Sequence, residues 1–360
     1  MIINLIKINQ GNDNSVFAGK IAVKHLISSY KIDTYHQVEN PNGYQRNLDE
    51  KRARNFASYL DKEVKAGRSP VIPTSVLLSY RKPIKYTEKN GICEAVFTDG
   101  ESFYVVDGQH RTNGFKMAIE ELGLNQLLNY ELPVIIFENT KLVNEIKQFL
   151  LINNNMKKVK TDLARQLMIQ LGQKGENIIP QNEEVGIKAT NITNMLANSL
   201  SSPWKGTLAG PNFEKSARTY NTILSFANSL KPIINSAYAL RTKKADELAE
   251  ELAKYWQAWE KLVPEAFEDH KNYLITKNNG FVSLNRVFAE VYYHFKQVKG
   301  INSPTVKDYM EVLKQAGDAC EVSYWHKNDG EAAGFGGGYG GFNNLADHIL
   351  DLLRDNGVEF

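Results

Sequence analysis

The feature that most constrains this fold is an abrupt change of periodicity within residues 103–122. Residues 103–106 are aromatic or β-branched, which favours a strand. Asp107-Gly108 follows, a pair typical of tight turns because glycine adopts backbone angles that other residues avoid. The apolar residues beyond the turn recur at the spacing of one helical face: Phe115, Ala118, Ile119 and Leu122. The segment therefore predicts a strand, a corner and a helix over residues 112–122.

Polar side chains crowd onto this corner: Asp107, Gln109, His110 and Arg111. The first amides of a helix have no partners within the helix and carry a positive partial charge, so such a corner suits an anion, most often a phosphate. A guanidinium beside it grips a phosphate through two hydrogen bonds. The structural alternative is that Asp107 only caps the helix, His110 is a satisfied structural residue and Arg111 is a surface charge.

The composition is that of a globular protein, with 42% hydrophobic and 23% charged residues. The formal net charge of +2 does not by itself indicate a nucleic-acid binder. Cys93 and Cys320 are far apart, which is typical of a reducing compartment and excludes a zinc ribbon. No apolar run approaches the roughly 18 residues of a membrane span, and the apolar start is too short for a signal peptide. We expect a cytoplasmic protein with no membrane partner.

Residues 1 to about 140 mix strands and helices. The strands are expected at 20–27, 74–78, 94–97, 103–106 and 132–137. A helix is expected over residues 49–64 because apolar residues recur along one face. Thr98-Asp99-Gly100-Glu101 predicts a hairpin that joins the strands before and after it.

The rest of the chain is mainly helical. Helical periods are present at 142–151, 161–171, 191–200, 213–230, 248–262 and 284–295. Because 360 residues exceed the size of a single core, we expect two domains. The predicted fold class is α+β, with a mixed sheet-and-helix domain over residues 1–150 and a mainly helical domain over 151–360.

Two segments lack a regular period. Residues 172–189 contain Gly, Pro and charged residues and predict an exposed connection. Residues 334–341 form a Gly-rich loop before a last helix at 345–353. Such a loop can wrap a phosphate with backbone amides, but no Lys-Ser/Thr pair follows, so it is no Walker A motif. A flexible loop is the simpler interpretation.

Residues 107–111 match the signature of the DGQHR-domain family, whose best known members are the DNA sulfur modification proteins called DndB. Two flanking segments also resemble that family. Upstream, Gly-Tyr-Gln-Arg at 43–46 precedes Leu-Asp-Glu-Lys-Arg-Ala at 48–53, and downstream a helical run ends in Ile-Asn-Asn-Asn at 152–155. The resemblance covers about the first 165 residues.

This domain is similar in turn to the ParB and sulfiredoxin superfamily, whose members set such a corner against nucleotide phosphates. The resemblance implies a ParB/sulfiredoxin-like fold for residues 1–150 and a bound nucleoside triphosphate, ATP or another, with Mg²⁺. Sulfiredoxin chemistry does not follow, because Gln109 stands where the thiolate nucleophile would be and an amide cannot replace it. Cys93, before the hairpin, is a poor substitute. The resemblance implies a function that involves nucleotides and DNA and not sulfur redox chemistry.

Asp107 and His110 are the candidate catalytic residues. Asp107 is expected to hold Mg²⁺ through water or to position the attacking water. His110 is expected to hydrogen-bond the phosphate or to transfer a proton, since its ordinary pKa is near neutrality. The candidate nucleotide-binding residues are Gln45, Arg46, Gly108, Gln109, Arg111 and Thr112.

Each of these binding residues has an expected role. Gly108 lets the backbone approach a phosphate, and Arg111 binds the phosphate oxygens. Gln109 offers an amide to a base, a sugar or a water, while Thr112 donates its hydroxyl. The pair at residues 45–46 forms a second wall of the pocket, since the family combines that segment with the corner. The alternative for its arginine is a solvated charge ahead of the helix.

A basic cluster after the asparagine run is the candidate DNA contact: Lys157, Lys158, Lys160 and Arg165. Such residues contact phosphate backbones, although clusters of this size are usually solvated surface. The same discount applies to a second cluster: Arg241, Lys243 and Lys244. No recognition helix with base-reading residues is apparent.

Three functional hypotheses follow. The first is an accessory or regulatory protein of a DNA modification system, which either introduces phosphorothioates or inserts deazaguanine bases. This protein binds a nucleoside triphosphate, with or without hydrolysing it. Its partners are DNA and other DNA modification proteins, and a homo-oligomer is compatible with the sequence. The second is a DNA-binding transcriptional regulator without turnover. The third is a ParB-like nuclease in which Asp107 holds a metal ion.

Overall fold

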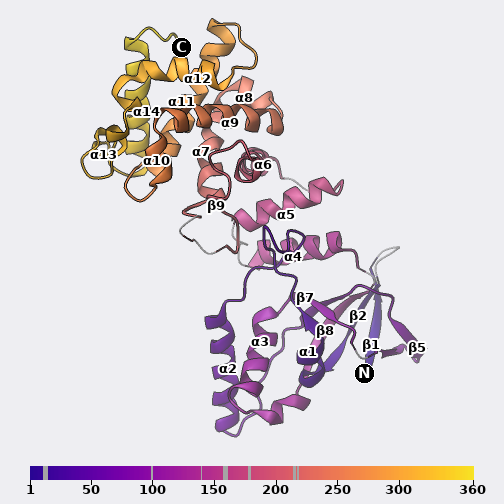
Figure 1. The fold of residues 1–360 in the computed structure, drawn as a ribbon. Helices are drawn as coiled ribbons and strands as arrows, with labels where there is room; N and C mark the ends of the chain where they lie inside the picture. The colour runs from indigo at the N-terminus through magenta and orange to yellow at the C-terminus, as the bar shows by residue number, and fades with distance from the viewer. Residues whose placement is uncertain are drawn as a thin grey trace. The chain divides into compact units, whose positions relative to one another are not determined.

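The computed structural model describes residues 1–10, 15–98, 100–138, 140–156, 161–176, 180–213, 216 and 219–360. The chain divides into two compact units, Met1–Leu163 (unit 1) and Ala164–Phe360 (unit 2). The fold class is α+β: unit 1 combines a sheet with helices and unit 2 is mainly helical (Figure 1). The boundary between the units lies beyond the position predicted at residue 150. No helix in the described ranges has the length and apolar character needed to span a membrane.

Unit 1 is built on an eight-stranded mixed sheet with the order β3-β7-β4-β8-β2-β1-β6-β5. Its strands are β1 (Ile2–Asn9), β2 (Ser15–Ala22), β3 (Tyr30–Lys31), β4 (Val76–Tyr80), β5 (Lys85–Lys89), β6 (Ile92–Val96), β7 (Phe103–Asp107) and β8 (Glu131–Glu138). Neighbours are antiparallel except for the pairs β3–β7 and β4–β8. Along β1, Ile3 and Leu5 are buried while Ile2 and Ile6 are exposed, which is the alternation of a sheet packed on one face.

In its described residues, unit 1 contains the helices α1 (Val23–Ser29), α2 (Glu50–Lys65), α3 (Gln109–Glu120) and α4 (Leu142–Met156), together with the 3-10 turn η1 (Asn125–Asn129). Helix α2 begins where the Asp49 side chain accepts a hydrogen bond from the Arg52 amide. Helices α2 and α3 pack side by side, as Figure 1 shows. Gly114 permits this close approach, because a Cβ there would lie 2.9 Å from the Ala53 carbonyl oxygen.

Two local predictions for unit 1 were wrong. Residues 20–27 are the end of β2 followed by α1, not one strand. The predicted hairpin of 94–97 with 103–106 does not form: β6 pairs with β5 and β1, whereas β7 pairs with β3 and β4. The hairpin turn is instead Asn90-Gly91, where both residues have positive φ. That dipeptide suits a two-residue turn better than the longer segment chosen from the sequence.

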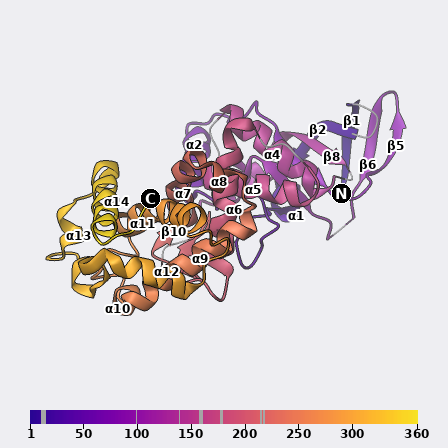
Figure 2. The same cartoon turned by 90° about the horizontal axis from the view of Figure 1, so that it is seen from above.

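Unit 2 contains short strands β9 (Leu208–Ala209) and β10 (Asn221–Thr222) and a set of packed helices (Figure 2). The α-helices are α5 (Thr161–Gln173, which begins in unit 1), α6 (Glu184–Asn198), α7 (Ile223–Ser236), α8 (Tyr238–Thr242), α9 (Ala245–Leu262), α10 (Pro264–Glu268), α11 (Asn278–Tyr293), α12 (Val306–Leu313), α13 (Glu331–Gly334) and α14 (Gly338–Asp355). The shorter turns are η2 (Gln181–Glu183), η3 (His294–Val298), η4 (Lys314–Cys320) and η5 (Val322–Trp325). The apolar stripes predicted along 248–262 and 284–295 are core faces, as expected.

The irregular segments of unit 2 are shorter than predicted. Helix α6 begins at Glu184, inside the expected connection 172–189. Its Gly186 packs against the Arg165 guanidinium, where a Cβ would lie 2.7 Å away. Residues 334–341 are not one loop: α13 ends at Gly334 and α14 already begins at Gly338. Conversely, α7 begins only at Ile223, not at residue 213. For α6 and α14, burial of the following apolar face outweighs the local preference of the glycines, whereas α7 begins where the Thr222 side chain caps it.

Candidate functional site

The predicted corner exists at the end of β7. Gly108 has φ 104° and occupies the N-cap position of α3, which has no side-chain cap. A Cβ at this position would lie 3.2 Å from both Val76 Cγ1 and Arg111 Nη2, so glycine is required by conformation and by space. The first amides of α3 therefore lack both an intrahelical partner and a capping side chain. This is the local arrangement that binds anions.

Arg111 anchors the corner to the segment before β4. Its Nη1 donates to the carbonyl and hydroxyl oxygens of Thr74, and its Nη2 donates to the Ser75 carbonyl at 2.9 Å. Nη2 also lies 3.3 Å from the Asp107 carboxylate. Burial lowers the pKa of Arg111, while Asp107 opposes that shift. The guanidinium thus already has partners within unit 1, and its predicted contact with a phosphate stays a prediction.

Three other predicted binding residues are buried inside unit 1. Gln45 Nε2 donates to the carbonyls of Val105 and Val106 at 2.9 and 2.7 Å, which fastens the segment before α2 to β7. Thr112 donates its hydroxyl to the Gly108 carbonyl at 3.3 Å. Gln109 is 4% exposed. Their side chains shape the corner from within and leave its outer surface to other residues.

A buried ionic network also holds the segment before α2 that contains Gln45. The Glu145 carboxylate on α4 is fully buried and accepts from Arg81 Nε and from Ser79 Oγ at 2.7 and 2.8 Å. Arg81 also pairs with Asp33 at 2.7 Å, and the Asp33 carbonyl accepts from the amide of Gln45. A buried carboxylate with this many partners is tightly placed. The network therefore fixes the backbone at Gln45 and so positions Arg46, the next residue in the chain, before any ligand binds.

His110 joins the start of α3 to the start of α2. Its Nε2 accepts a hydrogen bond from the Asp49 amide at 3.3 Å. The pKa of His110 is lowered to about 4, chiefly by burial and then by the positive charges of Arg52 and Arg46, while two aspartates oppose the shift. His110 is therefore neutral at pH 7. Because Nε2 is the acceptor, the ring proton resides on Nδ1.

Two guanidinium groups flank this imidazole. Neither Arg46 nor Arg52 forms a side-chain hydrogen bond or an ion pair with any residue that the structure describes. Burial lowers the pKa of Arg46, and Arg52 lowers it further, while the nearby carboxylates of Asp107 and Asp49 oppose the shift without direct contact. By contrast, Arg54 on the same helix pairs with Glu121 at 3.0 Å. The corner thus carries two positive charges that lack a paired carboxylate.

Sequence reasoning included Arg46 and missed Arg52. The sequence signal that could have identified Arg52 is its place in the Leu-Asp-Glu-Lys-Arg-Ala segment, three residues after the N-cap Asp49. Arg52 is in the first turn of α2, and the Asp49 amide at this end of the helix donates to His110 in the first turn of α3. Arg52 becomes a candidate site residue only because α2 packs against α3, and the sequence does not show that packing.

Asp107 is the candidate metal ligand. Its side chain is 44% exposed and shares its carboxylate with Arg111. No group of three or more potential metal ligands occurs in the described ranges. Mg²⁺ in nucleotide sites is commonly held by one or two carboxylates together with phosphate oxygens. Asp107 fits that role only alongside a bound phosphate.

The predicted DNA contacts are not brought together at a described surface. Lys157, Lys158 and Lys160 lie outside the described residues. Arg165 is 3% exposed, and its Nε pairs with Glu183 at 3.0 Å inside unit 2. Its side chain has a packing role and offers no surface to a phosphate backbone.

Comparison with known families supplies the context of this site. The family model for DndB, described as DNA-sulfur modification-associated, matches residues 6–292. The chain belongs to the DndB family. Both units contribute to the match, and the α3 corner lies within it. Neither a curated protein nor a solved structure gives a significant match to this DndB-family protein. Its functional context is DNA sulfur modification.

Proposed function

We propose that this DndB-family protein is an accessory or regulatory component of a DNA phosphorothioation system and that it binds a nucleoside triphosphate at the start of α3. One observation carries the proposal: the uncapped start of α3 under Gly108 is flanked by two guanidiniums, Arg46 and Arg52, that have no paired carboxylate among the described residues. Helix amides together with arginines are a recurrent solution for phosphate groups.

Each group at the corner has a task in this proposal. The amides at the start of α3 donate to phosphate oxygens. Arg46, just before α2, and Arg52, in the first turn of α2, neutralise the negative charge of the phosphates. The neutral His110 donates its Nδ1 proton to the same group. Asp107 is the residue that would hold Mg²⁺, which supplies charge neutralisation at the phosphates. Gln45, Gln109 and Thr112 support the corner from below.

Hydrolysis is the further step of the proposal. Asp107 orients an attacking water once its ion pair with Arg111 loosens, and turnover is coupled to DNA binding. A second candidate, a DNA-binding regulator that binds the nucleotide without turnover, is favoured by two contacts: the Asp107 carboxylate is shared with Arg111, and His110 Nε2 is occupied by the Asp49 amide. Neither group is then free to act as a general base. Among the residues that the structure describes, no contact favours the nuclease hypothesis.

The test is ATP titration of matched variants, with and without DNA. Arg46→Ala and Arg52→Ala are each expected to weaken binding about 10- to 100-fold, the effect of losing one charge-assisted hydrogen bond. Arg54→Ala is the control, since it removes the same charge from α2 but its side chain pairs with Glu121. Equal losses in all three variants, or no ATP binding by the wild type, would contradict the proposed site.

Release of inorganic phosphate separates the two candidates. Release that rises on adding DNA and falls in Asp107→Asn supports coupled hydrolysis. Nucleotide binding without release, together with DNA binding that changes with ATP, supports the regulator.

A further inference from the structure

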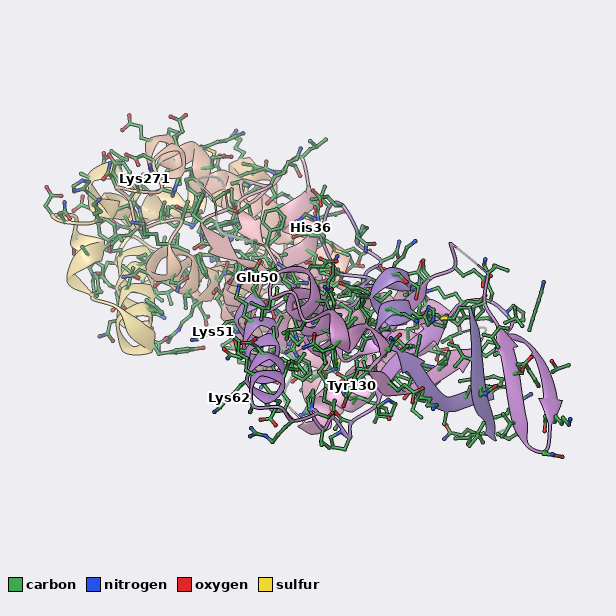
Figure 3. The ribbon with its side chains drawn as sticks, turned by 90° about the horizontal axis from the view of Figure 1, so that it is seen from below. His36, Glu50, Lys51, Lys62, Tyr130 and Lys271 are labelled. Carbon is green, nitrogen blue, oxygen red and sulfur yellow. The ribbon has the colours of Figure 1, made fainter. Side chains whose placement is uncertain are left out.

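A group of lysines in unit 2 has no part in the α3 corner. Lys271 lies in the connection between α10 and α11, Lys277 is the residue before α11, and Lys327 follows η5 (Figure 3, in which Lys271 is labelled). The two connections are joined by their backbones, because the Lys327 amide donates to the Asn272 carbonyl at 2.8 Å. Three cations from two connections are thereby brought into one cluster, here called the lysine cluster.

The side chains of Lys277 and Lys327 converge on the backbone of Lys271. Lys277 Nζ and Lys327 Nζ both donate to the Lys271 carbonyl oxygen, at 3.0 and 3.2 Å. The two ammonium groups consequently lie within about 6 Å of each other, where like charges repel appreciably. Burial lowers the pKa of Lys277, and Lys327 lowers it further, while Asp269 acts in the opposite direction. An anion placed between the two would relieve this repulsion.

The neighbouring carboxylate does not neutralise the cluster by direct contact. Asp269 accepts hydrogen bonds from the amides of Lys271 and Asn272 and from the Asn272 side chain. Within the described part of the chain, none of the three lysines forms an ion pair. The charge of the cluster is therefore available to an external anion.

The setting of the cluster adds to its affinity for anions. Lys277 is the N-cap residue of α11, a 16-residue helix without a side-chain cap, so the positive end of the helix dipole faces the same place. Gly280 lets the preceding connection pack on the first turn, since a Cβ there would lie 2.2 Å from the Ile275 carbonyl oxygen. The backbone that bears the lysines is thus held closely against the helix.

An aromatic pair lies beside the lysines. His270, directly before Lys271 in the chain, is stacked on Tyr220 with ring centroids 4.0 Å apart and an interplanar angle of 5°. The ring pair packs the residue that precedes Lys271 against Tyr220. Lysines placed in this way bind the phosphates of a nucleic-acid backbone through their charge, whatever the base sequence.

We propose that the lysine cluster is a DNA-contacting surface of unit 2, in which Lys271, Lys277 and Lys327 bind backbone phosphates beside the Tyr220–His270 stack. This inference rests on the DNA coupling in the proposed function and names the surface that carries it. It does not depend on the nucleotide corner.

The experiment compares two triple variants of the full-length chain. Lys271→Gln, Lys277→Gln and Lys327→Gln are combined, since glutamine removes the charge but keeps a donor for the Lys271 carbonyl. The control combines Lys299→Gln, Lys307→Gln and Lys314→Gln, which removes the same charge from exposed positions elsewhere in unit 2. Binding of a fluorescently labelled 30-base-pair duplex is followed by anisotropy between 50 and 200 mM salt, with thermal melting to confirm folding.

The cluster variant is expected to bind the duplex at least about tenfold more weakly at low salt, with a salt slope smaller by about 2 to 3. The control variant and the ATP affinity of both variants should match the wild type. Unchanged DNA affinity in the cluster variant, or an equal loss in the control, would overturn the inference and leave the proposed nucleotide site standing. A wild type that binds no DNA would overturn both the inference and the DNA coupling, but not the effect of Arg46→Ala on ATP binding.

Discussion

The pKa of His110 allows a quantitative test of the contacts at the start of α3. In the folded protein that pKa is lowered from 6.5 to about 4, first by burial and then by Arg52 and Arg46. In the unfolded chain it returns to its ordinary value. Between pH 6.5 and 4 the unfolded state therefore binds a proton that the folded state does not. The free energy of unfolding is expected to fall as the pH drops through this window, and the loss is complete below pH 4.

The size of the effect follows from the shift. Between pH 7.5 and pH 5, the full shift corresponds to a loss of about 2 kcal/mol. Because the ring is only partly buried, solvent screening reduces the expected loss to about 1 kcal/mol. His110→Gln removes the titrating group, while its side-chain oxygen can still accept from the Asp49 amide. The variant should lose about 1 kcal/mol less stability than the wild type over this pH interval.

Urea denaturation of both proteins at the two pH values measures this difference, and NMR titration of the imidazole measures the pKa directly. Arg52→Ala should raise the pKa of His110, whereas Arg54→Ala, whose charge pairs with Glu121, should leave it unchanged. Bound triphosphate should also raise it, because a negative charge beside the ring favours the protonated form. A wild-type pKa near 6.5, or identical pH dependence of wild type and His110→Gln, would refute the arrangement described for this corner.

Two further substitutions test how the corner is held. Gly108→Ala should destabilise the protein by about 2 kcal/mol in urea denaturation, because alanine is strained at φ 104° and its Cβ meets Val76. Gly123→Ala, where φ is also positive but the Cβ meets open space, should cost only about 1 kcal/mol; equal costs would argue against the steric role of Val76. Arg111→Lys should lower the melting temperature nearly as much as Arg111→Ala, since a lysine cannot reproduce the donors to Thr74 and Ser75. Full stability with lysine would show that charge alone matters there.

Local sequence determined several parts of this protein. The α3 corner was predictable because the run at 103–107, the Asp-Gly pair and the helical spacing beyond it all act over a few residues, and the structure places a strand, a left-handed glycine and a helix there. The helical stripes of unit 2 were predictable for the same reason, since periodicity is a property of neighbouring residues. The family signature lies in the same short segment.

Tertiary contacts decided which side chains are available at the corner. The sequence could not show that Arg111 would be used by Thr74 and Ser75, or that Gln45 would turn inward to the carbonyls of β7. Nor could it show that the start of α2 would bring Arg52 beside His110. The sequence also could not show the strand pairing, because β7 pairs with β3 and β4 and not with β6, the strand before it in the chain. Hydrogen bonds and charges depend on distances in space, and those distances are set only when segments remote in sequence pack together.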